Sequence, residues 1–415
     1  METDVKDEQR FFESVLENFF NKKELKEFSR KTLSNKVNTS EKGVIGSTEK
    51  RQISLEIDDY IEINLQVDLL ITFAHSRLDK HKFIELLFLL GRFTITSGKF
   101  QTAIYIHEKI LSEINEDKTL LSLSASAQLA LGEIFSRTAV WALSFEYIKK
   151  ANSSYNKIHD IKGCANCMNL LGTIHGDRGE LGKAVRYFEK GLKLLENTND
   201  DYLQAKIGIN LGIVNNISGD YETALSYYKR ALLYFEKIKD MNKIAEIRHN
   251  MGMLYTRKKD LKNAIKEFDK SISFSVQCGD VSTRGLPYLS KAYIYTLQND
   301  LYLASAFANK ALEICSRIND KLSIADIYKI NGIIQRKLGS YELAENYLLT
   351  SLRLNEELQN KLNQAETSLE IGRLYLETGR ADESKKYFNE AIKYYKSIKA
   401  SNELASIVSE LDGNF

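Results

Sequence analysis

The feature that most constrains the fold of this chain is a repeat of about forty residues. A glycine recurs at nearly constant intervals, and its column reads Gly91, Gly132, Gly172, Gly212, Gly252, Ala292, Gly332 and Gly372. The first interval is 41 residues and the next six are 40 residues each. Self-similarity at such a period is typical of architectures in which each unit packs against its neighbours. The chain is therefore predicted to hold eight units and not one large globular core.

Three further columns keep a fixed distance from this glycine. Seven residues later, six of the eight members are Gly or Asn, which tolerate a left-handed helix cap. Twelve residues later the residue is Ala or Ser in every unit, and small residues let two helices approach closely. Two residues after the glycine every member is apolar, and apolar positions recur at helical spacing. Each unit is thus predicted as a helix, a short turn, a second helix and a short link.

This pattern resembles the tetratricopeptide repeat. The residues that carry the resemblance are Leu211–Gly212, the turn Gly219-Asp220-Tyr221, Ala224, Tyr228 and Ala231, and it extends over residues 80–400. The common form repeats every ~34 residues. The longer, forty-residue repeat unit of this chain is similar to the subclass found in cell-polarity adaptors with Leu-Gly-Asn repeats and in bacterial regulators. The resemblance implies an all-α, right-handed superhelical solenoid of eight hairpins with helical caps, whose first helices line a concave groove.

The segments outside the repeats are predicted to be helical or flexible. Residues 1–32 form an amphipathic, aromatic-rich helical segment, 33–52 a polar linker, 53–79 a capping helix, and 401–415 a C-terminal capping helix and tail. Alternating apolar residues at 53–57 are a competing strand signal, although the length of the segment favours a helix. The N-terminal segment either packs on the first repeats or detaches to dock in the groove or on a partner.

Composition excludes several classes of function. The chain has 58 basic and 56 acidic residues, so its net charge of +2 gives no electrostatic case for nucleic acid or an anionic membrane. A single proline among 415 residues favours long helices. We see neither a signal peptide nor an apolar run of membrane-spanning length. Four scattered cysteines fit a reducing compartment, and we expect a cytoplasmic protein.

Motifs for catalysis, metals or cofactors are weak. Cys164 and Cys167, with His175 nearby, suggest zinc, but no second ligand pair accompanies them. Cys167 shares its column with Ala and Ile and His175 with Phe and Tyr, so we predict that both pack in the core. The stretch from Gly43 to Lys50 resembles a phosphate loop only superficially, because it lacks the Gly-Lys-Ser/Thr end. We therefore expect no catalytic residues, no metal and no cofactor.

What remains is a binding surface on the first helices. An Asn amide can donate to and accept from a peptide backbone, so Asn210 and Asn250 in consecutive units are predicted to hold an extended chain, unless they simply face water. A basic cluster further along could pair with an acidic ligand, although Asp326, Glu366, Glu370 and Glu377 could neutralise it. The predicted groove residues are Asn169, Asn210, Asn216, His249, Asn250, Met253, Arg257, Tyr293, Lys329, Arg336, Lys337 and Arg373.

The sequence thus predicts a non-catalytic scaffold or adaptor that binds an extended or helical segment of another protein in its groove. The alternative is a signalling regulator whose groove senses a peptide and controls an output, for which the N-terminal ~80 residues are the candidate. These residues show no helix-turn-helix motif. A homo-oligomer is possible but not indicated.

Overall fold

The structure is a computed structural model that describes residues 17–28, 67–96, 98–115, 117–278, 284–398 and 400–412. The predicted linker at 33–52, the phosphate-loop-like stretch and the competing strand at 53–57 lie outside these residues. Among the described residues the regular secondary structure is helical and no strand occurs. The predicted all-α class is therefore confirmed.

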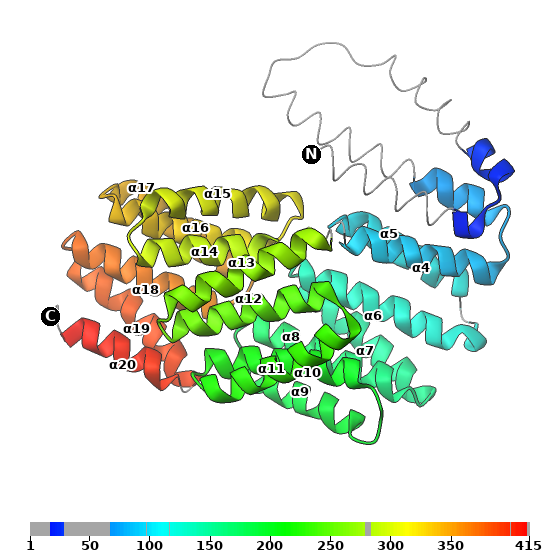
Figure 1. Ribbon diagram of the computed structural model, residues 1–415, viewed down its shortest axis with the longest axis horizontal. Coiled ribbons are helices and arrows are strands. Elements are labelled where there is room, and N and C mark those ends of the chain that lie inside the picture. The colour runs from blue at the N-terminus through cyan, green and yellow to red at the C-terminus, as the bar shows by residue number, and fades with distance from the viewer. Residues whose placement is uncertain are drawn as a thin grey trace, which may run out of the picture. The chain divides into compact units, whose positions relative to one another are not determined.

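The helices form hairpins, each with a first and a second helix joined by a short turn (Figure 1). We number them as repeats 1 to 8. They are α4 (Lys80–Thr96) with α5 (Phe100–Ile114), α6 (Leu121–Arg137) with α7 (Trp141–Lys157), α8 (Ile161–Asp177) with α9 (Leu181–Leu195), α10 (Asp201–Ile217) with α11 (Tyr221–Ile238), α12 (Met241–Arg257) with α13 (Leu261–Gln277), α14 (Gly285–Leu297) with α15 (Leu301–Arg317), α16 (Lys321–Lys337) with α17 (Tyr341–Glu357), and α18 (Lys361–Glu377) with α19 (Ala381–Ser397). A 3-10 turn, η1 (Lys118–Leu120), precedes α6, and α20 (Ser401–Asp412) follows the last hairpin.

The chain divides into two compact parts. The first holds residues 1–95 and 99–118, and the second holds 96–98 and 119–415, which include repeats 2 to 8. In the first part, the described N-terminal residues pack against the helix at 67–75. Phe20 and Phe28 are buried there, and each ring centroid lies 5.3 Å from that of Phe73. Arg77 also donates to Glu27 at 2.7 Å. These contacts are with the predicted capping segment at 53–79, and whether the N-terminal segment packs on the first repeats or detaches stays a prediction.

The turn inside each hairpin requires a left-handed residue. All eight members of the second column have positive φ, from 56° at Ala139 to 88° at Gly219. Lys259 adopts the same conformation at 61° although it carries a side chain. In repeat 4 the N–H of Asp220 then reaches back to the carbonyl of Asn215 at 2.9 Å, the bond that defines a Schellman cap. The geometry of the turn is thus kept even where the residue type is unfavourable.

The acidic residues at the links begin the next first helix. Asp160, Asp200, Asp240 and Asp320 each accept a hydrogen bond from the backbone N–H three residues later, at 2.8–3.1 Å. A carboxylate at this position satisfies a free N–H of the first turn and lies at the positive end of the helix dipole. The same arrangement opens second helices, where Asp220 accepts from Thr223 at 3.1 Å. The acid in these four links is therefore an N-cap.

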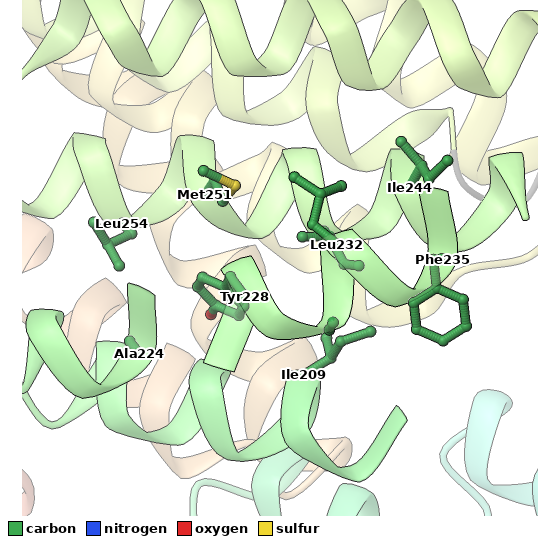
Figure 2. Close-up of a cluster of buried hydrophobic side chains, with 10 residues drawn as sticks. Ile209, Ala224, Tyr228, Leu232, Phe235, Ile244, Met251 and Leu254 are labelled. Atoms are coloured by element: carbon green, nitrogen blue, oxygen red, sulfur yellow. The ribbon is translucent and has the colours of Figure 1, made fainter. Parts of the chain in front are cut away.

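The small residues of the repeat are explained by contacts within each hairpin. A Cβ atom at Gly212 would lie 2.6 Å from the ring of Tyr228, and one at Gly172 would lie 2.4 Å from Phe188. Tyr228 is fully buried and packs with Met251 and Leu254 of the next repeat (Figure 2). A larger side chain at the glycine would force the two helices apart. Glycine and aromatic ring therefore act together as one packing element.

Within the second part, the chain also returns on itself. The indole N–H of Trp141 in repeat 2 donates to the carbonyl of Leu358, 217 residues later, at 2.7 Å. The N–H of Lys361 donates to the carbonyl of Arg178 at 3.2 Å. The hydroxyl of Tyr394 donates to the carbonyl of Gly179 at 3.0 Å. We call these contacts the seam, because they join repeats 2 and 3 to the end of repeat 7 and to repeat 8.

Candidate functional site

The predicted groove residues lie on the first helices of repeats 3 to 8. We call the surface they share the inner face. It comprises Asn169 on α8, Asn210 and Asn216 on α10, His249, Asn250, Met253 and Arg257 on α12, Tyr293 on α14, Lys329, Arg336 and Lys337 on α16, and Arg373 on α18.

Side-chain hydrogen bonds connect neighbouring first helices across this face. The amide of Asn210 donates to Asn169 Oδ1 at 2.9 Å, so it is already engaged with the preceding repeat. His249 Nε2 lies 3.0 Å from the hydroxyl of Ser290 in the following repeat. By contrast, Nδ2 of Asn250 has no hydrogen-bond partner although the residue is buried, and neither does Oδ1 of Asn216. Buried polar atoms are rarely unpaired, so these two atoms stand out among the polar groups of the face.

Lys329 lies at the centre of a charged cluster. Its Nζ is 2.9 Å from Asp326 and 2.5 Å from Glu366 of the next repeat. Burial disfavours its charged form, but the two carboxylates outweigh this effect and raise the pKa of Lys329. The charge of Lys329, together with that of Arg257, likewise holds the pKa of Glu366 below its usual range against the effect of burial.

The other basic residues of the predicted cluster are also paired internally. Arg336 donates to Glu370 at 3.0 Å and forms a short bond to Glu377. Arg373 bonds to Glu370 and, at 2.8 Å, to Glu410 of α20. Lys337 differs, because it is exposed and has no ion pair among the described residues. The acidic side chains therefore neutralise the cluster, and an acidic ligand loses its electrostatic support.

One ion pair spans three repeats. Arg257 at the end of α12 lies 3.7 Å from Glu366 of α18. The two residues are 109 positions apart, so the pair depends on the curvature of the array. It connects repeat 5 to repeat 8 through side chains of the inner face alone. At this point the face is bridged by the protein's own side chains.

A second charged group was missed by the sequence analysis. Glu133 pairs with Arg137 at 2.9 Å, and Lys243 pairs with Glu246 at 2.6 Å. Lys206 has no ion pair among the described residues, and burial followed by the charge of Lys243 lowers its pKa. A signal was present: the position six before the glycine is charged in several repeats, as Lys206, Glu246, Asp326 and Glu366.

The cysteine and histidine motif belongs to the core. Cys167 is fully buried, and burial raises the pKa of its thiol to about 12. His175 lies 2.7 Å from Glu180 and stacks on Tyr187 at 5.2 Å. The described residues hold no group of three metal-binding side chains. Packing, as the repeat columns predict, accounts for the positions of Cys167 and His175.

No described helix combines the length and apolar character needed to span a membrane. The architecture defines the chain as a repeat protein built from helical hairpins that stack through small residues. A tetratricopeptide repeat model matches residues 203–275 and 323–397, and a second tetratricopeptide repeat model matches 164–201. The chain is a tetratricopeptide repeat protein, and repeats of this type form protein-interaction domains. A search of curated proteins finds no match.

Two solved structures illustrate the fold. The Rap conjugation gene regulator of the plasmid pLS20, in complex with the Phr* peptide, has a TM-score of 0.56 and 19% identity, over 81% of this chain and 95% of its own. The apo form of the quorum sensor NprR from B. thuringiensis has a TM-score of 0.50 and 14% identity, over 85% of this chain and 99% of its own. At these identities the similarity shows the fold.

Proposed function

We propose that the protein is a peptide-sensing regulator. An extended polypeptide segment binds along the inner face, and occupancy of this face controls an output segment, for which residues 1–79 are the candidate. This proposal favours the alternative function over a passive adaptor. It includes no catalysis, and it places the protein in the cytoplasm.

The observation that carries the proposal is the ion pair between Arg257 and Glu366. A guest chain lying along the inner face would displace Glu366 from Arg257, because the pair crosses the face. Displacement would break the contact that couples repeat 5 to repeat 8, while Glu366 keeps its pair with Lys329. Binding therefore changes contacts between distant repeats. A ligand with different affinity for the two arrangements shifts their populations, which is the requirement for a sensor.

The composition of the inner face suits an extended chain. The position after each glycine is apolar in four successive repeats: Ile213, Met253 and Tyr293 are partly buried, whereas Ile333 is buried in the core. Nδ2 of Asn250, which has no hydrogen-bond partner, lies on the same face and can donate to a peptide carbonyl without reading the sequence of the peptide. With first helices about 10 Å apart, four repeats extend over about 30 Å. An extended segment of about eight to nine residues covers this length.

The structural neighbours support the same ligand class. The pLS20 regulator forms a complex with the Phr* peptide, and NprR is a quorum sensor. Because this chain shares their fold, a peptide is the first ligand to test. The chemistry of binding must come from the side chains of this chain, since the sequence identity is low.

A random library of octapeptides with free termini tests the proposal. Wild type is compared with Asn210→Ala/Asn250→Ala on the inner face and with Tyr302→Ala, whose side chain is 84% exposed on α15. We expect wild type and Tyr302→Ala to enrich the same peptides and the double variant to lose them. Arg336 is left unchanged, because its replacement would disturb Glu370 and Glu377.

The outcomes separate the two functions. Retention of the same peptides by the double variant would place the binding surface elsewhere. If peptides bind but leave hydrogen exchange around Arg257 and Glu366 unchanged, the protein is an adaptor and not a sensor. A sensor shows faster exchange around Arg257 at the end of α12 and around Glu366 within α18, because the ion pair is broken.

A further inference from the structure

Repeat 4 contains a hollow that the inner face does not include. It has a volume of about 300 Å³ and lies between α9, α10 and α11. Gly208 and Ala205 line it from α10, and Tyr227, Ala231 and Tyr234 line it from α11. A second hollow of about 360 Å³ adjoins it and shares Tyr234. Leu192 of α9, Asp201 and Gln204 of α10 and Arg230 of α11 complete the lining. The walls thus combine two tyrosine rings and small apolar groups with a polar rim.

Packing inside the protein does not require glycine at position 208. A Cβ atom there would meet only Tyr227, at an ordinary distance of 3.5 Å, whereas one at Gly212 would clash at 2.6 Å. Glycine in the interior of a helix is less favourable than alanine. Gly208 therefore weakens α10 without permitting a close approach of helices. Its structural effect is to keep the hollow beside Tyr227 open.

Two other repeats fill the same place with an aromatic side chain. Position 208 corresponds to Tyr288 in repeat 6 and Tyr328 in repeat 7, which are 80 and 120 residues later. Their rings contact Phe307 and Tyr347, with centroids 6.1 and 5.9 Å apart. Phe307 and Tyr347 are the counterparts of Tyr227 at the same spacing. Repeats 6 and 7 thus show which group fits against the position of Tyr227.

In repeat 4 this aromatic partner is missing. Tyr227 is half-buried and contacts no other ring among the described residues, while Gly208 leaves the opposite place open. Aromatic rings gain specific contact energy when they pair in this distance range. The unpaired ring of Tyr227 is therefore a preformed half of an aromatic contact.

We propose that the hollow at Gly208 is a docking site for an aromatic side chain of a partner polypeptide. The partner's ring packs against Tyr227, in the place that repeats 6 and 7 fill themselves. An exposed aromatic side chain continues the surface beyond the hollow: Tyr202, which lines the adjoining second hollow, is 38% exposed. This extension suits a polypeptide better than a small metabolite. The site uses other residues than the inner face, so it does not rest on the proposed function.

Two blocked tripeptides test the proposal, acetyl-Ala-Tyr-Ala-amide and acetyl-Ala-Leu-Ala-amide. Their binding is measured by saturation-transfer NMR with wild type, Gly208→Tyr and Gly208→Ala. Gly208→Tyr supplies the missing ring internally, and Gly208→Ala leaves most of the hollow open. We expect wild type to bind the tyrosine peptide several-fold more tightly than the leucine peptide. Gly208→Tyr should weaken the tyrosine peptide by up to about tenfold, whereas Gly208→Ala should keep it.

Three results would overturn the proposal. The first is equal binding of the tyrosine peptide by wild type and Gly208→Tyr. The second is equal binding of the tyrosine and leucine peptides, and the third is binding of free L-tyrosine without binding of the blocked peptide, which would indicate a metabolite site. If Gly208→Tyr does not fold, Tyr227→Leu replaces it, since loss of the wall ring should abolish the same preference.

Discussion

Replacement of Lys329 by methionine distinguishes a structural charge cluster from a ligand site. Methionine keeps the apolar stem, so the change removes the ammonium group and leaves Asp326 and Glu366 facing each other. Breaking a buried ion pair by removing one partner costs about 3–5 kcal/mol. Here the carboxylate side chains remain 28% and 29% exposed, so water screens part of the repulsion. We expect the free energy of unfolding to fall by about 2–3 kcal/mol at pH 7.5.

The loss of stability in Lys329→Met should depend on pH with a definite sign. Without Lys329, the group that lowers the pKa of Asp326 and Glu366 is gone, and both folded-state pKa values rise. A carboxyl group whose folded pKa is raised binds protons more readily in the folded state. Stability therefore increases as the pH falls. The deficit of Lys329→Met relative to wild type should be smaller at pH 5 than at pH 7.5.

Urea unfolding followed by circular dichroism at both pH values measures these differences. Lys337→Met is the matched control, because Lys337 lies on the same helix and is exposed and has no ion pair among the described residues. Its effect should stay within about 0.5 kcal/mol. The reasoning fails if Lys329→Met is no less stable than this control, or if its deficit grows at pH 5. A stable Lys329→Met protein would return this residue to the list of ligand-binding candidates.

Three further predictions concern packing, the seam and titration. Gly212→Ala should lower stability by about 1–2 kcal/mol through overpacking, whereas Gly208→Ala should raise it by about 0.5–1 kcal/mol. Thermal unfolding measures both changes, and shifts of the same sign would contradict the packing argument. Trp141→Phe removes the donor to the Leu358 carbonyl and should cost about 1 kcal/mol with faster hydrogen exchange in that link, so unchanged exchange would argue against the seam. Burial lowers the pKa of His249 to about 4, so its contribution to stability is lost as the pH falls from about 6.5 to about 4. His249→Gln should flatten the pH profile of unfolding in this window, and an unchanged profile would show that His249 is not the responsible group.

The sequence predicted the hairpins because their geometry depends on local positions. Each turn needs a left-handed residue at one place, and the column from Gly98 to Gly379 marks it even where Ala139 or Lys259 stands there. Cys167 and His175 were placed in the core because the other members of their columns are apolar or aromatic. Such inferences rest on neighbours within one repeat or at a distance of one period.

The pairing on the inner face was harder to predict, since it depends on the curvature of the array. Lys329 and Glu366 are 37 residues apart, so a search one period ahead could have found their contact. The pair Arg257 and Glu366 spans three periods, and no column of the sequence indicates it. Gly208 was overlooked for another reason: a glycine that leaves space and a glycine that permits a close approach look alike in a sequence.

The seam sets a limit on how this array can evolve. An open solenoid can gain or lose a repeat at little cost, since each hairpin contacts only the next. Here Trp141 contacts Leu358 and Gly179 contacts Tyr394, so the two ends of the segment from repeat 2 to repeat 8 are joined by hydrogen bonds. The repeats between these ends must therefore cover a fixed distance. An added or deleted hairpin between α9 and α17 would carry these groups out of register. The number of hairpins in this segment is therefore fixed by the contacts between its two ends, whereas the number of repeats outside the segment is free to vary.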